Sequence, residues 1–283
     1  MIDFEYRDAY TIRDLEKLIA ALRGEGGCPW DQAQTHESIR RNFIEETYEA
    51  CEAIDEGDPL HLREELGDVL IQVLFHARIE EEAGRSNLDD IADATCRKLL
   101  FRHPHVFGDL KLSGEAQALA AWDERKRLEK SQETTTAAMA SVAKSLPALW
   151  RAEKIQAKAQ KVGFDWPSAQ GALDKLSEEL VELSEAVSEK SRVAEELGDL
   201  LFSAVNVARF SGIDPEEALH SACDKFTERF RYLEEAALKN GTPLSALSLD
   251  EMEALYQEGK QWLKCAEDSP CALSNTSNFQ KKN

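Results

Sequence analysis

The sequence carries two copies of an acidic pattern whose spacing suits the binding of a divalent cation. Glu64-Glu65-Leu66-Gly67-Asp68 recurs as Glu195-Glu196-Leu197-Gly198-Asp199. Each copy follows a second acidic cluster, Glu45-Glu46-Thr47-Tyr48-Glu49 in one case and Glu178-Glu179-Leu180-Val181-Glu182 in the other. Carboxylates three residues apart share one face of a helix, so each cluster presents an acidic pair. Two such pairs on facing helices would surround a hard cation.

The residue types limit which ion such a cage would hold. Four carboxylates without a counter-ion repel one another, and a divalent cation relieves the repulsion. Ligation by oxygen alone favours magnesium or manganese over zinc. A di-iron bundle would use Glu-x-x-His on two helices, and neither copy has that histidine. Glu-rich helix faces are often merely solvated, but the repetition of both clusters favours a site. The glycines within the motif, Gly67 and Gly198, predict that another helix approaches closely beside the cage.

Apolar residues at helical spacing predict an all-α chain built from a duplicated unit. Only 8 prolines and 14 glycines interrupt a sequence rich in helix formers. Loops are expected at residues 28–31, 103–108 and 162–166, where proline, glycine or turn residues break the pattern. Predicted helices cover residues 11–22, 38–54, 61–75, 88–101 and 115–130, then 147–161, 172–188, 194–210 and 215–238.

The repeat has an offset of roughly 130 residues, which suits two domains rather than a solenoid. We expect an N-terminal domain over residues 10–130, a linker over 131–146 and a C-terminal domain over 147–264. The composition after residue 264 predicts a disordered tail over 265–283.

Overall composition narrows the class of protein. At 283 residues and 42% hydrophobic content, the chain can bury a substantial core. Its net charge of -20, from 54 acidic and 34 basic residues, argues against binding to nucleic acid. The six cysteines form no C-x-x-C pair, and we expect them to be reduced. Without a secretory signal or an apolar run long enough to cross a bilayer, the chain is expected to be cytoplasmic, with no membrane partner.

A pair of basic residues at helical spacing also repeats, as Lys98 with Arg102 and Lys225 with Arg229. Together with the acidic clusters, the Gly27-Cys28-Pro29-Trp30-Asp31 turn and the Val162-Gly163-Phe164-Asp165-Trp166 turn, this pair gives a specific combination. The chain closely resembles the MazG family of nucleoside triphosphate pyrophosphohydrolases, over roughly residues 10–262 and in that family's tandem two-domain form.

The resemblance implies an all-α fold with two four-helix-bundle-like domains, a homodimer, and magnesium dependence with manganese as an alternative. It also implies hydrolysis of nucleoside triphosphates to monophosphate and pyrophosphate, with broad substrate tolerance in nucleotide-pool housecleaning. Related all-α enzymes acting on dUTP or phosphoribosyl-ATP use similar acidic helices. A metal-stabilised module that binds nucleotides or protein without cutting them is the alternative from another class.

Family roles carried onto matching positions identify the expected site residues. Glu178 would orient water beside the metal in the second domain, and Glu45 stands at the matching place in the first. The expected metal ligands are Glu179, Glu182, Glu196 and Asp199 in the second domain, and Glu46, Glu49, Glu65 and Asp68 in the first.

Several residues outside the cage are candidates for contact with substrate. Lys225 and Arg229 would grip phosphates, unless they form surface ion pairs. Lys158 belongs to a basic helix face that either binds phosphate or is simply solvated. Trp166 either stacks on a base or anchors its turn. Tyr256 stands where family members often have a tryptophan, which puts base stacking there in doubt.

The two halves differ at one position facing the cage. Seven residues beyond each motif aspartate, the first half has Phe75 and the second has Asn206. An asparagine can hold water or ribose, whereas phenylalanine cannot. In the family's two-domain members the second domain is taken to be the main catalytic one, and we expect the same here.

Overall fold

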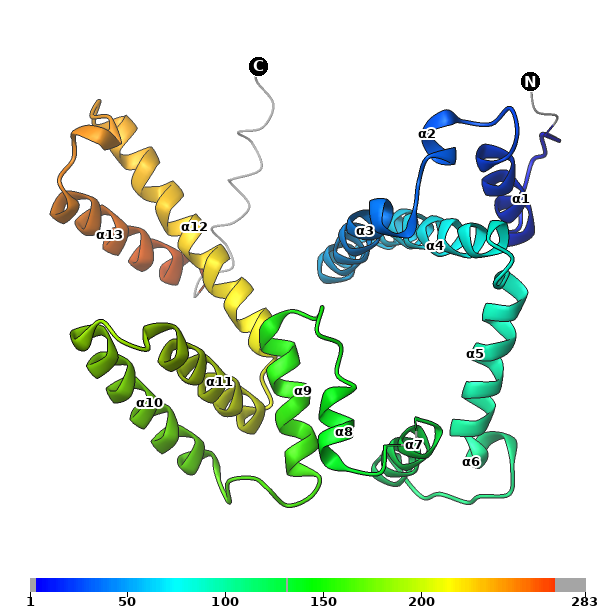
Figure 1. The fold of residues 1–283 in the computed structure, drawn as a ribbon. Coiled ribbons are helices and arrows are strands. Elements are labelled where there is room, and N and C mark those ends of the chain that lie inside the picture. The colour runs from blue at the N-terminus through cyan, green and yellow to red at the C-terminus, as the bar shows by residue number, and fades with distance from the viewer. Residues whose placement is uncertain (1–3, 131, 268–283) are drawn as a thin grey trace. The chain divides into compact units, whose positions relative to one another are not determined.

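The computed structural model describes residues 4–130 and 132–267, and the all-α prediction is confirmed, since these residues form helices and no strand. The chain divides into two compact units, Met1–Glu129 and Lys130–Asn283. Each unit is described by itself (Figure 1). Within the described residues, no helix combines the length and the apolar character needed to cross a membrane.

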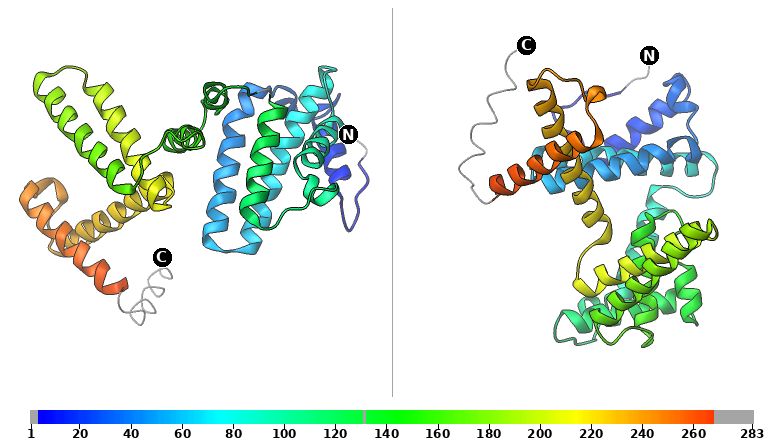
Figure 2. Two further views of the ribbon diagram at one scale, coloured as in Figure 1. Left: turned by 90° about the horizontal axis from the view of Figure 1, so that it is seen from below. Right: turned by 90° about the vertical axis from the view of Figure 1, so that its left-hand side faces the viewer.

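The first unit is organised around a helical hairpin. Helices α3 and α4 lie along one another, joined by Gly57 in the left-handed region at φ 68° and by Asp58, which caps α4 (Figures 1 and 2). Thr11 and Thr35 close capping boxes at the starts of α1 and α3, which fixes where these helices begin. The helices are α1 Ile12–Arg23, α2 Pro29–Gln32, α3 His36–Glu56, α4 Pro59–Glu82, α5 Leu88–Arg102, α6 Pro104–Phe107 and α7 Glu115–Glu129.

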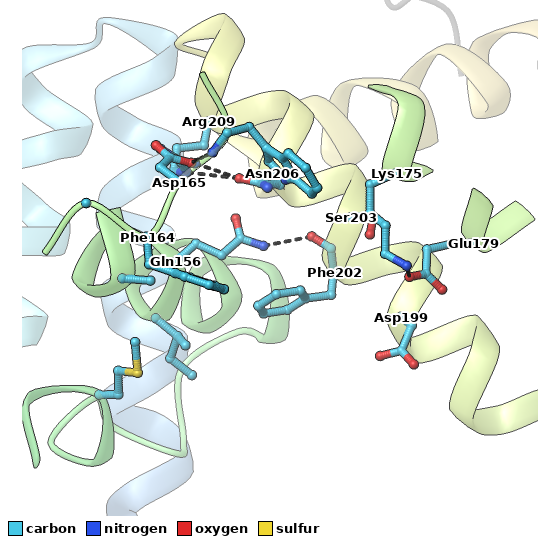
Figure 3. Close-up of a pocket in the computed structure, with 15 residues that line it drawn as sticks. Gln156, Phe164, Asp165, Lys175, Glu179, Asp199, Phe202, Ser203, Asn206 and Arg209 are labelled. Carbon is cyan, nitrogen blue, oxygen red and sulfur yellow. Dashed lines mark hydrogen bonds and ion pairs between the residues drawn. The ribbon is translucent and has the colours of Figure 1, made fainter. Parts of the chain in front are cut away.

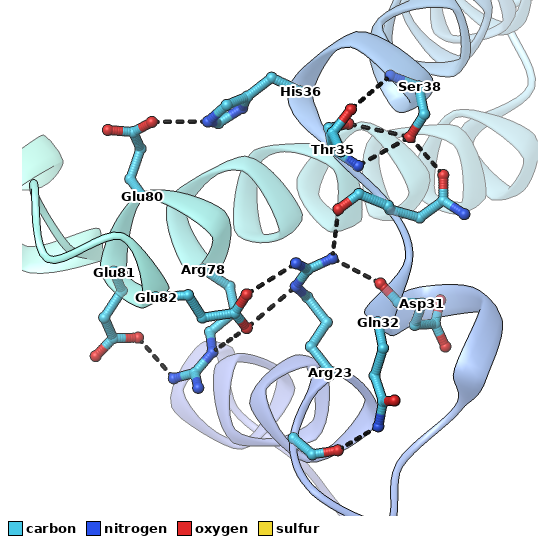
Figure 4. A network of polar contacts seen from close by, with 12 residues as sticks. Arg23, Asp31, Gln32, Thr35, His36, Ser38, Arg78, Glu80, Glu81 and Glu82 are labelled. Carbon is cyan, nitrogen blue, oxygen red and sulfur yellow. Dashed lines mark hydrogen bonds and ion pairs between the residues drawn. The ribbon is translucent and has the colours of Figure 1, made fainter.

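The core of this unit forms where α1 packs on the hairpin. Ile19, Ile39, Leu74 and Phe75 are buried together. At the rim, the buried Arg23 guanidinium donates to the carbonyl oxygens of residues 31 and 34, at 2.6 and 3.1 Å, and to the carboxylate of residue 82 (Figure 4). The arginine therefore ties the end of α1 and the α2 loop to α4.

The second unit contains two hairpins joined through α9. Helices α10 and α11 form one, and α12 and α13 form the other (Figures 1 and 2). Trp150 on α9 donates its indole N–H to the Asp214 carboxylate at 2.9 Å, and Asp214 also caps α12. The helices are α8 Thr135–Ala140, α9 Ala148–Gln160, α10 Ala169–Glu189, α11 Val193–Ser211, α12 Pro215–Lys239 and α13 Leu249–Glu267, with a 3-10 turn at Leu244–Ala246.

Several segments depart from the sequence-based expectations. Helix α4 continues seven residues past its expected end at 75, and α13 lies where no helix was expected. The expected loops at 28–31 and 103–108 contain the short helices α2 and α6, because Pro29 and Pro104 occupy the first helical position, where proline is tolerated. The expected linker 131–146 contains α8, which Thr134 caps. Residues 265–267 of the expected tail continue α13, and the remainder of that tail lies outside the described residues.

Candidate active site

The acidic repeat of the second unit brings carboxylates from two helices together. Glu179 on α10 and Glu196 and Asp199 on α11 each offer a ligand oxygen, and these oxygens all lie within 4.8 Å of one another. Glu179 and Glu196 are each 5% exposed, which is unusual for a carboxylate. Among the described residues, Glu179 Oε2 is buried without a hydrogen-bond partner. A buried carboxylate oxygen left unpaired costs free energy that a bound cation would recover.

Two basic side chains partly neutralise this cluster, each one helical turn before the acid it contacts. Lys175 Nζ lies 2.8 Å from Glu179 Oε1 and 2.7 Å from Glu178 Oε1. Arg192 lies 3.0 Å from Glu196 Oε1. These contacts occupy one oxygen of Glu179 and of Glu196, so the protein holds the cluster together while leaving the second Glu179 oxygen for another partner.

Glu182 was predicted as a fourth ligand, and it is not within the group of three. Its pKa is raised above the usual value, by desolvation first and then by the nearby charge of Glu179. The carboxylate therefore feels the cluster electrostatically.

The first unit repeats the arrangement with different members. Ligand oxygens of Glu46, Glu49 and Glu65 lie within 4.8 Å of one another. Desolvation, followed by the charges of Asp68 and Glu49, raises the pKa of Glu46. His61 Nε2 lies 3.3 Å from Glu65 Oε1, while Glu65 Oε2 is buried and unpaired. Asp68, the fourth predicted ligand, again stands outside the group of three.

A cavity of about 510 Å³ adjoins the second acidic cluster (Figure 3). Glu179 and Asp199 lie at one side of it, and aromatic rings of Phe164 and Phe202 at another. Its walls combine one acidic region with a mostly apolar surface, which suits a ligand having a charged end and a flat apolar body. The lining residues are Met139, Ile155, Gln156, Ala159, Gly163, Phe164, Asp165, Trp166, Lys175, Glu179, Asp199, Phe202, Ser203, Asn206 and Arg209.

Polar contacts fix the far side of this cavity. Arg209 forms a paired contact with the Asp165 carboxylate, which includes Nη1 to Oδ2 at 3.0 Å. Arg209 Nη2 also donates to Asn206 Oδ1 at 2.7 Å. The Arg209 guanidinium holds the pKa of Asp165 below its usual value. Because the Asn206 oxygen accepts a hydrogen bond from Arg209, its amide N–H groups remain to donate to a ligand.

Of the residues predicted to contact substrate, Trp166 and Asn206 line the cavity. Trp166 also packs against Gly171, where an added Cβ would meet the ring at 3.1 Å, so the turn anchor and the cavity wall are the same side chain. Lys158, Lys225, Arg229 and Tyr256 are not among the lining residues.

Arg229 and Tyr256 contact each other, with the Arg229 guanidinium 5.9 Å from the centre of the Tyr256 ring. Both Lys225 and Arg229 lie on α12, and Tyr256 lies on α13. The roles of Lys225 and Arg229 at the phosphates, and that of Tyr256 at the base, remain predictions.

The sequence reading missed several cavity residues. Lys175 had a usable signal, because it stands three and four residues before Glu178 and Glu179 on one helix face. Asp165 and Arg209 lie 44 residues apart, and nothing local in the sequence pairs them. Gln156 belongs to no sequence motif that would have identified it as a cavity residue.

The expectation of a close helix approach at Gly67 and Gly198 is wrong for the described chain. A Cβ added at either glycine would meet nothing within 4 Å. The glycines face open space, so packing within one copy of the protein does not explain them.

Fold and site together define an all-α protein with duplicated carboxylate clusters on helical hairpins, one of them beside a nucleotide-sized cavity. Comparisons with known proteins agree with this description of the fold and the site. A sequence model of the MazG nucleotide pyrophosphohydrolase domain matches residues 34–107 and 168–233, one segment in each half.

The chain is 42% identical to a nucleoside triphosphate pyrophosphohydrolase/pyrophosphatase MazG of Thermotoga maritima, over 87% of this chain and 94% of that protein. It is also 42% identical to a nucleoside triphosphate pyrophosphohydrolase of Escherichia coli, over 84% and 92% of the two chains. A Mycolicibacterium smegmatis protein of that name is 45% identical over 53% of this chain and 46% of its own. The chain therefore belongs to the MazG nucleotide pyrophosphohydrolase family.

Proposed function

We propose that this protein hydrolyses nucleoside triphosphates to nucleoside monophosphate and pyrophosphate, at the cavity of the second unit. The observation that carries the proposal is the unpaired, buried Glu179 Oε2 at the acidic side of a cavity with aromatic walls. A triphosphate would lie toward the acids through a bound cation, and the base and sugar would fill the apolar part. Membership of the family and the names of the relatives support the same reaction.

The donor set fits a hard divalent cation, magnesium or manganese. Glu179, Glu196 and Asp199 would hold it with oxygen ligands, and Glu182, whose pKa is raised by desolvation and by the charge of Glu179, would be the fourth ligand. The ion would neutralise phosphate charge and make water a better nucleophile. Glu178, which is exposed and ion-paired to Lys175, would orient a water and accept its proton.

We assign the main activity to the second domain, residues 147–264, and a weaker or structural role to the first, residues 10–130. Asn206 lines the cavity in the second unit. Its counterpart Phe75 is 7% exposed and belongs to the hydrophobic core of the first unit. A side chain committed to the core cannot contact a nucleotide, so the acidic cluster of the first unit lacks this polar wall.

We also propose a homodimer in the cytoplasm. The α10–α11 hairpin leaves several apolar side chains exposed, and on its exposed face an added Cβ at Gly198 would find open space. A second copy that packs its helices on this face would bury these side chains and explain the glycine. The exposed residues are Leu173, Leu180, Val181, Val187, Leu197 and Leu201.

The apolar surface of the cavity indicates how wide the range of substrates is. Most of its surface is aromatic or aliphatic, which accepts any base by its flat face. Broad tolerance among nucleoside triphosphates, suited to cleansing the nucleotide pool, is therefore favoured over a site narrowed to dUTP.

The test measures pyrophosphate and monophosphate from a panel of nucleoside triphosphates, with magnesium or manganese and purified protein. Wild type should release both products in equal amounts, and Asp199→Ala should release neither. Binding of nucleotide without any product would contradict the proposal and favour the alternative, a non-catalytic metal- and nucleotide-binding module.

A further inference from the structure

One cavity residue has a polar atom that the fold itself leaves without a partner. Gln156 on α9 is 7% exposed and lines the cavity. Its side-chain Nε2 donates to the main-chain oxygen of Phe202 at 2.8 Å (Figure 3). Its Oε1 is buried and has no hydrogen-bond partner within the described part of the chain. A buried acceptor of this kind is costly, and it calls for an explanation.

The orientation of the Gln156 amide follows from its partner. A main-chain carbonyl can only accept a hydrogen bond, so the NH2 group must face Phe202. The oxygen is consequently fixed as the remaining group, and it can only accept. Whatever satisfies Gln156 Oε1 must bring an N–H or O–H donor into the cavity.

The first half of the chain shows that the fold does not require a polar residue here. Glu16-Lys17-Leu18-Ile19-Ala20 on α1 matches Glu153-Lys154-Ile155-Gln156-Ala157 on α9, and Ile19 takes the place of Gln156. Ile19 packs in the same core cluster as Phe75, the counterpart of Asn206. Both positions are apolar in the half whose core is closed, and both are polar in the half that has the cavity. Helices can therefore pack here without an amide, and the unpaired Oε1 of Gln156 is a feature of the cavity.

The surroundings of Gln156 identify the part of the ligand that reaches it. Figure 3 places Gln156 beside the rings of Phe164 and Phe202, across the cavity from Glu179 and Asp199. If the acids hold the phosphate end, the end lying between aromatic rings is the base. We propose that Gln156 is a specificity-determining residue whose Oε1 accepts a hydrogen bond from an N–H on the edge of the nucleobase. This inference rests on the proposed function, because that function sets the direction of the nucleotide.

Such a contact is compatible with a broad substrate range. Adenine and cytosine offer an exocyclic amino group, and guanine and uracil offer a ring N–H. The residue would therefore accept all common bases while rejecting a base that has no N–H donor. A site built to pair a substrate N–H discriminates against an analogue that lacks it, because the buried acceptor is then left unpaired.

The experiment compares substrates that differ by one donor and gain no bulk. ATP is set against purine riboside triphosphate, and CTP against the triphosphate of 2-pyrimidinone riboside. Wild type should show kcat/KM about 10-fold lower for each analogue, the size expected for one unpaired buried acceptor. Equal values for analogue and parent would overturn the inference, while leaving pyrophosphate release, and hence the proposed function, intact.

Two variants show whether Gln156 causes the discrimination. Gln156→Met has similar length and no acceptor of comparable strength, and it should bring both ratios to within about twofold of one, because no acceptor is left to discriminate. Gln170→Met, an exposed glutamine on α10 outside the cavity, should keep the wild-type ratio. Discrimination that persists in Gln156→Met would overturn the inference.

Binding measurements separate the proposed base contact from the proposed reaction. Calorimetric dissociation constants of ATP and purine riboside triphosphate for the wild type measure the same difference without turnover. If the protein releases no pyrophosphate but still binds ATP more tightly than the analogue, the base contact stands and the proposed reaction fails. Equal affinities would count against the base contact itself. Thermal unfolding of Gln156→Met, compared with the wild type, shows whether that variant is folded.

Discussion

Arg209 on α11 and Asp165 in the turn before α10 face each other with two hydrogen bonds, although 44 residues separate them in the sequence. Both side chains are largely buried, at 10% and 16% exposed. The pair fastens the 163–166 turn onto α11, and that turn supplies Phe164 and Trp166 to the cavity wall. The ion pair therefore helps to hold this wall of the cavity in place.

Breaking this pair should therefore affect stability and substrate binding together. Asp165→Asn leaves the Arg209 charge without its counter-charge, and we expect a loss of about 1–3 kcal/mol in the free energy of unfolding. KM should rise more than kcat falls, because the turn and not the acidic cluster is disturbed. Urea unfolding and steady-state kinetics measure both effects.

The repeat supplies a matched control for that variant. Arg78 stands ten residues after its motif aspartate, as Arg209 does, but it makes surface contacts of 2.9 Å to Glu81 and Glu82. Arg78→Met should cost less than about 1 kcal/mol and leave KM unchanged. A similar effect from both variants would mean that the Arg209 pair does not shape the cavity.

The unequal halves predict an unequal response to the loss of a metal ligand. Glu179→Ala should lower kcat by about 100-fold or more, since removing a direct ligand costs at least as much as disturbing its support. Glu46→Ala, its counterpart, should keep activity near the wild-type level. Initial rates of pyrophosphate release at saturating magnesium measure the contrast, and equal losses from both variants would refute the assignment of activity to the second unit.

Much of this arrangement could be predicted from sequence because it depends on local spacing. Helices α3, α10 and α11 were expected within about three residues of their observed ends, since apolar periodicity and caps are local signals, whereas α4 runs to Glu82, seven residues past its expected end. Three of the four acids expected in each cluster, such as Glu179, Glu196 and Asp199, do lie together for the same reason. The contrast of Asn206 with Phe75 also came from counting residues along one helix face.

The parts that sequence could not provide depend on contacts between distant segments. Gln156 donates to the Phe202 carbonyl 46 residues away, and every residue type carries such a carbonyl, so the sequence gives no signal for this contact. The short helices at Pro29 and Pro104 were missed because a proline that begins a helix looks like one that breaks it. Gly198 was read as a close contact within the chain, and only the structure shows that its surface is open.

Adding and removing metal should change stability as well as activity. A ligand at 100 times its dissociation constant stabilises the folded state by about 2.7 kcal/mol, so magnesium should raise the unfolding midpoint, and a chelator should reverse this and stop turnover. Glu182→Gln removes an exposed carboxylate whose pKa is raised by partial desolvation and by the charge of Glu179. The metal-free variant should therefore be more stable than metal-free wild type, while its response to magnesium becomes smaller. An unchanged midpoint on adding magnesium to wild type would argue against a cation site.

Gly198 gives a test of the dimer in which the sign of the effect is decisive. In a single copy, Gly198→Leu should be neutral or stabilising by up to about 1 kcal/mol, because glycine is a poor helix former and the space is open. If a second copy packs on this face, the added side chain collides with it. We expect the variant to shift from dimer to monomer in sedimentation velocity, whereas a dimer of unchanged or greater stability would contradict packing at this face.

The histidine pair of the first unit predicts how stability depends on pH. His36 and His76 lie with their Nδ1 atoms 2.7 Å apart, and His36 Nε2 contacts Glu80 at 2.7 Å. Burial, followed by the charge of His36, lowers the pKa of His76 below its usual 6.5. Between the two pKa values the unfolded chain binds more protons than the folded protein, so stability is present above 6.5 and is lost as the pH falls through it.

The matched variant is His76→Val, because Val207 occupies this position in the second half. Urea unfolding from pH 7.5 to 5.5 should show a steeper loss for wild type than for His76→Val. The pH slopes of the unfolding free energy for the two proteins should differ by less than about 1.4 kcal/mol per pH unit, the limit for one full proton, because His76 is only partly buried. His61 has a raised pKa through its bond to Glu56, and it acts in the opposite direction in both proteins, so its contribution cancels in the comparison. Parallel curves for the two proteins would show that His76 titrates as it does in the unfolded chain.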